Sequence, residues 1–110
     1  MIKKRCAYDV QREDDVITVI LHGEIDHHGA VGVRGDIDAL IYEERPKKML
    51  LDMSDIDFMD SSGLGLVMGR YALMQKTGGE FALKAPNPRI KKIFELAGLE
   101  RIIKIEEDGR

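Results

Sequence analysis

The sequence predicts one α/β domain over residues 1–110, with a mainly parallel, mixed β-sheet packed by α-helices. A chain of 110 residues is long enough for one small domain around one hydrophobic core. Short apolar runs and amphipathic segments follow one another as strand, strand, and then helix and strand three times over. Because parallel neighbours need a crossover connection, and helices usually supply it, this alternation predicts helices packed against a mainly parallel sheet.

The first half of the chain is expected to hold three strands and one helix. Residues 6–10 predict a weak strand, the polar residues 12–15 a hairpin turn, and residues 16–21 a stronger strand that is apolar on both faces. Asp26 is a good N-cap for the following helix, which Pro46 ends. Residues 49–53 predict a buried strand, and residues 54–60 are expected to form a polar loop.

The second half predicts two more helices and two more strands. Asp60, Ser61 or Ser62 caps a helix that ends at Gly78-Gly79. Its expected apolar stripe is Leu64, Val67, Met68, Tyr71 and Met74. A strand over residues 81–85 precedes a helix that Pro86 and Pro88 open and Gly98 ends, with the apolar residues Ile90, Ile93, Phe94 and Leu96. Residues 102–105 predict the last strand, and residues 106–110 are expected to fray.

Composition and charge exclude several classes of protein. With 17 Lys and Arg against 20 Asp and Glu, the net charge is −3, which gives no basic face for direct contact with nucleic acid. The longest apolar run, residues 16–21, is too short to span a membrane. Cys6 is the only cysteine, so no internal disulfide can form, and a reducing, cytoplasmic location is expected.

Three possible chemical sites have simpler structural explanations. Seven residues, 54–60, lie between the strand at 49–53 and the helix start that carries Gly63, Gly65 and Gly69, whereas a dinucleotide-binding loop follows its strand directly. The group His22, Asp26, His27 and His28 lacks established metal-ligand spacing. Asp52 lies in a strand that resembles the phospho-acceptor strand of a receiver domain, but the acidic pair Asp14-Asp15 comes before a strand, whereas a receiver has its pair just after one. We therefore expect neither a cofactor nor a metal.

The run Asp60-Ser61-Ser62-Gly63-Leu64-Gly65 places two hydroxyl groups at the start of an amphipathic helix. Taken alone, this run is an ordinary helix N-cap. A nucleophilic serine also needs a general base and an orienting acid, and the sequence offers no such arrangement, so we do not expect an enzyme.

Two blocks of sequence resemble one protein family. Residues 58–65, continuing to Gly69-Arg70-Tyr71, resemble the anti-sigma factor antagonists, which are STAS-domain proteins. Gly23-Glu24-Ile25-Asp26-His27-His28 is similar to the sporulation branch, the antagonists of the anti-sigma F factor. Residues 90–99 give a weaker third match.

The resemblance implies a partner-switching mechanism. In the family, a cytoplasmic anti-sigma factor that is itself a serine kinase holds a sigma factor inactive, and the unphosphorylated antagonist binds the kinase and displaces the sigma factor. The kinase phosphorylates the first serine of the motif, here Ser61, and a serine phosphatase reverses this step. The resemblance carries the partner-binding surface over to Gly23, Glu24, Asp26, His27, Met59, Asp60, Ser61, Ser62, Gly63, Leu64 and Arg70.

One departure and two alternatives remain. Family members often carry a further C-terminal helix, whereas this sequence stops at Arg110, so we expect one face of the sheet to be less covered. The chain could instead be a small-ligand or nucleotide-binding STAS domain. It could also be a general-stress antagonist of the same family, although the Asp26-His27-His28 block argues against that branch.

Overall fold

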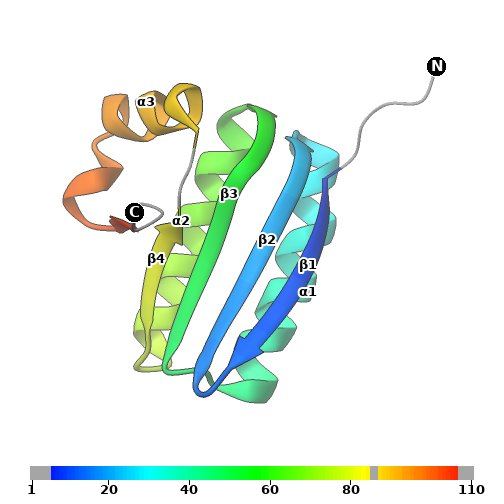
Figure 1. Cartoon of the computed structure of the whole chain (residues 1–110), viewed down its shortest axis with the longest axis vertical. Helices are drawn as coiled ribbons and strands as arrows, with labels where there is room; N and C mark the ends of the chain where they lie inside the picture. The colour runs from blue at the N-terminus through cyan, green and yellow to red at the C-terminus, as the bar shows by residue number, and fades with distance from the viewer. Residues whose placement is uncertain (1–5, 85–86, 107–110) are drawn as a thin grey trace.

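The computed structural model describes residues 6–84 and 87–106 and confirms the predicted order of elements. The chain runs β1 (Ala7–Glu13), β2 (Val16–Ile25), α1 (His27–Glu44), β3 (Lys48–Met59), α2 (Ser61–Lys76), β4 (Glu80–Lys84), α3 (Pro88–Leu96), a 3-10 turn (Leu99–Arg101) and β5 (Lys104–Glu106). The five strands form one sheet in the order β1-β2-β3-β4-β5 (Figure 1). Only the β1–β2 pair is antiparallel, so the sheet is mixed and mainly parallel as expected.

Helices α1 and α2 lie side by side behind the sheet in the view of Figure 1. The sheet side chains that face them are fully buried, as in the alternation of Ile17, Val19 and Leu21 along β2. Thr18 and Ile20, between them, are only half-buried on the other face. The strand that was expected to be covered on both faces is therefore closed on one face and partly open on the other.

Strands β2 and β3 are longer than predicted, and this is the main correction to the expected fold. β2 continues to Ile25, and β3 continues to Met59 through the segment that was expected to be a polar loop. The prediction of a loop at residues 54–59 is wrong because Met53, Ile56 and Met59 are buried at a spacing of three rather than two. Register shifts between β2 and β3 accommodate this spacing, and Gly23 (φ 92°) lies beside one of them.

Smaller corrections concern the first turn and the C-terminal third. β1 extends to Glu13, so the turn is shorter than the predicted residues 12–15. Residues 99–101 form a helical turn, and the last strand begins at Lys104 rather than at residue 102. Leu96 was expected in the apolar stripe of α3 but is 79% exposed, whereas Ile90 and Phe94 are buried as expected. The segment 106–110 was expected to fray, but Glu106 is the last residue of β5. The rest of that segment, the predicted strand end at residue 85 and the predicted helix start at Pro86 lie outside the described residues.

The buried face of α2 also differs from the predicted stripe. Val67 and Met74 are buried as expected, but Met68 is exposed, and Leu66 and Arg70 are buried instead. The reason is that α2 packs against α1 as well as against the sheet, and residues four apart share a helix face. Within the described ranges, no helix is long and apolar enough to cross a membrane.

Helix α1 ends in a backbone conformation that glycine favours. Arg45 follows the last helical residue with φ 47° and ψ 55°, and its N–H donates to the carbonyl of Ile41 at 3.0 Å. A side chain with a Cβ is strained in this left-handed region.

We therefore expect Arg45→Gly to raise the free energy of unfolding by roughly 0.5–1 kcal/mol, because relief of strain exceeds the extra flexibility of the unfolded chain. Urea denaturation measures this difference. Arg45→Ala is the control, since it removes the same side chain but keeps the Cβ. An equal gain in both variants would show that strain is not the cause.

Candidate functional site

The two sequence blocks meet at one edge of the sheet. β2 and β3 run parallel, so their carboxyl ends lie together, with Gly23 opposite Ile56 and Ile25 opposite Met59. The N–H of Asp60 donates to the carbonyl of Ile25 at 3.1 Å and ties the two chain segments just beyond the strands. Both helices begin at this same edge, which is the upper edge in Figure 1.

An aspartate caps each of these helices. Asp26 Oδ1 accepts from the N–H of Gly29 at 2.9 Å at the start of α1, as the sequence predicts. Asp60 Oδ1 accepts from the N–H of Ser62 at 2.8 Å at the start of α2. Of the three candidate caps, the structure thus selects Asp60, and Ser61 becomes the first helical residue with its side chain exposed.

The predicted partner-binding residues differ in how accessible they are. His27 and Ser61 are exposed. Five are half-buried: Glu24, Asp26, Asp60, Ser62 and Leu64. Gly23, Met59, Gly63 and Arg70 are buried. The exposed and half-buried residues form a surface at the start of the two helices, and the buried ones support it from within.

Arg70 lies farther along α2, where it connects the two helices. Its side chain is buried, and Nε lies 2.8 Å from Asp38 Oδ1 of α1. The Nε–H group is not oriented for a hydrogen bond to this oxygen, so the contact is an ion pair. Burial lowers the pKa of Arg70, the Asp38 carboxylate opposes that change, and Arg34 adds to it. This arrangement supports an indirect role for Arg70, in which it fixes α1 against α2.

Sequence reasoning did not single out Asp38. Asp38 directly follows the buried Ile37 in α1, and this position next to a core residue is the local feature that could have indicated a half-buried carboxylate. Its partner could not be found without knowing how α1 and α2 pack.

A shallow groove of about 240 Å³ runs between α1 and α2, next to Ser61. It is lined by His27, Ala30, Val31, Arg34, Ser62, Gly65 and Leu66. Val31 is 47% exposed, so the groove offers apolar surface together with one cationic side chain. Such a surface suits contact with another macromolecule better than enclosure of a small molecule.

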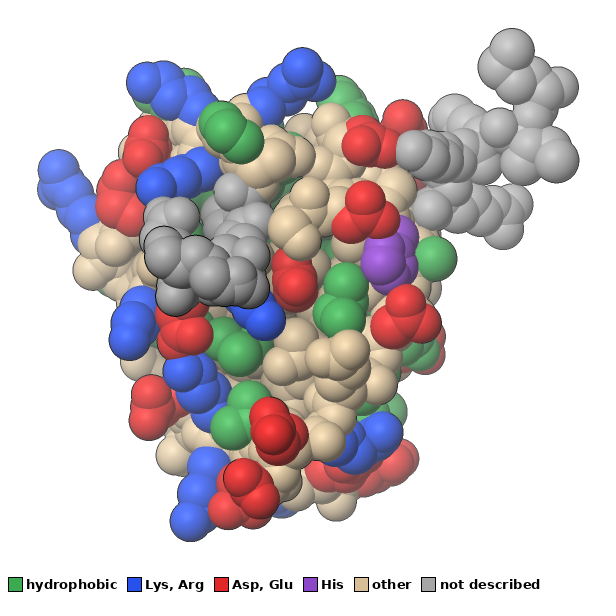
Figure 2. All heavy atoms as spheres, in the orientation of Figure 1, with side chains coloured by type: hydrophobic (Ala, Val, Ile, Leu, Met, Phe, Trp, Pro, Cys, Tyr) green, Lys and Arg blue, Asp and Glu red, His purple; other side chains and the backbone are tan. Residues whose placement is uncertain are grey.

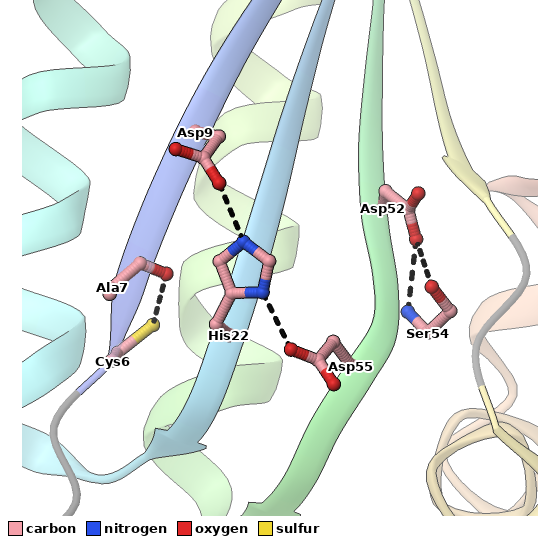
Figure 3. A network of polar contacts seen from close by, with 7 residues as sticks. All are labelled: Cys6, Ala7, Asp9, His22, Asp52, Ser54 and Asp55. Carbon is pink, nitrogen blue, oxygen red and sulfur yellow. Dashed lines mark hydrogen bonds and ion pairs between the residues drawn. The ribbon is translucent and has the colours of Figure 1, made fainter.

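His22 lies in β2, on the face of the sheet opposite the helices (Figure 3), whereas His27 and His28 begin α1. Its ring contacts Asp55 of β3 and Asp9 of β1. The group His22, Asp26, His27 and His28 is therefore not brought together. Among the residues that the structure describes, no group of three or more His, Cys, Asp or Glu side chains could hold a metal ion.

Comparison with known proteins finds one domain family that matches most of the chain. A family model described as "STAS domain" matches residues 7–109. The anti-sigma F factor antagonist of Paenibacillus polymyxa is 35% identical over 100 residues, which cover 91% of this chain and 86% of that protein. The anti-sigma-B factor antagonist of Bacillus subtilis (strain 168) is 32% identical over 97 residues, with 88% and 87% covered.

Solved structures with the same fold include two forms of one antagonist. The anti-sigma factor antagonist SpoIIAA in its unphosphorylated form matches with a TM-score of 0.80 and 28% identity, covering 93% of this chain and 90% of that one. The Bacillus cell fate determinant SpoIIAA in the phosphorylated form matches with a TM-score of 0.74 and 28% identity, covering 93% of each chain.

The first turn of α2 depends on a glycine. A Cβ added at the buried Gly63 would lie 2.0 Å from Met59 Cγ and 2.4 Å from Met59 Sδ. Met59 is itself only 5% exposed, so its side chain has little room to move aside.

Gly63→Ala is expected to lower the free energy of unfolding by about 1–3 kcal/mol through this overlap. Urea denaturation is the measurement. Gly65→Ala is the matched control, because nothing lies within 4 Å of a Cβ there. In a Met59→Ala background the cost of Gly63→Ala should shrink, and an equal cost in both backgrounds would contradict the explanation.

Proposed function

The chain belongs to the STAS domain family, and from this premise we propose that it is an anti-sigma F factor antagonist that phosphorylation of Ser61 switches off. Proteins of this kind are regulatory binding proteins and not enzymes. In the proposed cycle, the unphosphorylated chain binds an anti-sigma factor that is a serine kinase and releases its sigma factor. The kinase then modifies Ser61, and a serine phosphatase restores the active form in the cytoplasm.

The position of Ser61 is the observation that carries this proposal. Ser61 is the exposed first residue of α2, at the edge where β2 and β3 end together. Because Asp60 supplies the cap, the Ser61 hydroxyl is not needed for that role. A kinase bound to this edge could reach the hydroxyl without unfolding the helix.

Electrostatics explains how one phosphate could act as a switch. A phosphoserine carries roughly −1.5 to −2 charges and three acceptor oxygens. At a helix N-terminus, backbone N–H groups and the helix dipole favour negative charge, so the domain itself should tolerate the group. A partner surface that fits a neutral serine would have to desolvate the new charge, and the adjacent Asp60 adds to the negative potential. Phosphorylation would then weaken binding without unfolding.

Two branches of the family are close candidates, since the relatives named for the anti-sigma F and anti-sigma-B factors are 35% and 32% identical to this chain. The Asp26-His27-His28 block supports the sporulation branch. Titration of the chain with the anti-sigma F and anti-sigma-B factors distinguishes the two.

Incubation with the anti-sigma F factor of the same organism and ATP should add one phosphate, and Ser61→Ala should abolish it, because Ser61 is exposed at the helix start. Mass spectrometry measures the added phosphate. Ser62→Ala is the control, and it should still gain one phosphate, because it keeps Ser61. Full labelling of Ser61→Ala would move the acceptor to another residue.

Phosphorylated protein is expected to keep its melting temperature but to bind the nucleotide-loaded anti-sigma F factor at least tenfold more weakly, a change of about 1.4 kcal/mol. Calorimetric titration and thermal melts of both forms provide the measurement. Ser61→Asp should reproduce only part of the loss, because it supplies a single charge. Equal affinity of the two forms would exclude the switch, and a collapsed melt would indicate unfolding instead.

A further inference from the structure

His22 joins three strands through its two ring nitrogens (Figure 3). Nδ1 lies 2.6 Å from Asp55 Oδ2 on β3, and Nε2 lies 2.9 Å from Asp9 Oδ2 on β1. Both carboxylates are well exposed, and the imidazole lies between them on the face that α1 and α2 leave open. Figure 2 shows this face, with a histidine flanked by acidic side chains.

The contact lies where the backbone pairing of β2 with β3 is irregular. The register shifts between Ile20 and His22 and again between Gly23 and Glu24. Regular ladder hydrogen bonds hold parallel strands together, so each shift leaves the strand ends less constrained. The His22–Asp55 contact bridges the strands between the two shifts. Beyond it, β2 and β3 lead directly to Asp26 and Ser61.

Both contacts require the protonated imidazole. A carboxylate accepts hydrogen bonds and cannot donate, and a neutral imidazole carries only one N–H. When the second proton is lost, a nitrogen lone pair faces a carboxylate oxygen, and one of the two contacts must open. The hydrogen bond to Asp55, and then that to Asp9, raises the pKa of His22 above 6.5.

The charges that act on His22 are those of Asp55 and Asp9, and both carboxylates favour the imidazolium. The same strands carry further acidic side chains, which are Glu13, Glu24, Asp52 and Asp57. Their cations, Arg12 and Lys48, pair with the other end of β2, opposite Ile17 and Val16. Burial raises the pKa of the nearby Cys6 thiol to about 11, so this thiol remains uncharged at neutral pH.

We propose that His22 is a positioning residue for the Ser61 site, and that its imidazolium holds the ends of β2 and β3 in the geometry that binds the anti-sigma factor. Binding should therefore weaken as the pH rises and the proton is lost. The affinity part of this proposal rests on the proposed function, whereas the coupling between His22 and the sheet edge does not.

The first experiment needs no partner. In a pH titration followed by NMR of the histidine rings and the backbone amides, we expect the midpoint of the His22 ring signals to lie above about pH 6.5. Asp55→Asn should lower it. Amide signals of residues 23–26 and 59–62 should shift with the same midpoint, and His22→Gln should abolish that response. His28→Gln, which leaves the network intact, is the matched control. If the amide signals of residues 23–26 and 59–62 do not shift with the His22 midpoint, the proposal is wrong.

The free energy of unfolding, measured as a function of pH, also tests the proposal without a partner, and the direction of its change can be predicted. Because the folded pKa lies above the unfolded one, the stabilisation is fully present below about pH 6.5 and is lost as the pH rises through the folded pKa. The free energy of unfolding should fall across this range in the unchanged chain and in His28→Gln, relative to His22→Gln. Parallel curves for all three proteins would overturn the proposal.

The second experiment measures affinity for the anti-sigma F factor of the same organism at pH 6.5 and 8.5, with folding checked by circular dichroism. Between pH 6.5 and pH 8.5 the affinity of both proteins is compared, and we expect the fold-loss of affinity to be at least three times larger for the unchanged chain than for His22→Gln. His27 is present in both proteins, so its contribution cancels. Equal losses would overturn the positioning role. Absence of binding at both pH values would overturn the proposed function, and the amide titration alone would then decide the role of His22.

Discussion

The parallel pairing of β2 with β3 is the constraint on which the candidate site depends. Two parallel neighbours must be joined by a crossover, and α1 provides it. Because β2 and β3 end at the same edge, α1 and α2 also begin there, and the positive ends of two helix dipoles face one surface. The site is therefore a result of the topology before any side chain is considered, and Asp26, Asp60 and Ser61 then give it its chemistry.

The layer behind this edge is held by contacts that specify geometry more than they add stability. In the Arg70–Asp38 pair between α2 and α1, Arg70 is buried and Asp38 is half-buried, and the desolvation of these charges offsets part of their attraction. Gly63 allows the first turn of α2 to rest directly on Met59. Both features fix how the helices sit on the sheet, so substitutions inside the domain can alter a surface that they do not touch.

Most of the fold could be predicted from sequence, and the failures share a physical origin. Capping residues and apolar periodicity depend on neighbours in the chain, so the order of elements and the cap at Asp26 could be predicted, and the cap of α2 could be narrowed to Asp60, Ser61 or Ser62. The second half of β3 was missed because register shifts break the alternation on which strand prediction depends. The burial of Arg70, its pairing with Asp38 and the contacts of His22 depend on residues distant in sequence, and no local pattern encodes them.

The reactivity of the half-buried Cys6 thiol can be used to measure how often the β1 edge of the domain opens. The thiolate is the reactive form of cysteine, and a pKa of about 11 leaves almost none of it at neutral pH. Cys6 precedes β1, and its Cβ lies 3.0 Å from the position that a Cβ on Gly29 would occupy in α1. Alkylation of this thiol is consequently expected to be slow in the closed fold and faster in conformations in which the β1 edge has separated from α1. Its rate would follow how often that edge opens in the otherwise folded protein.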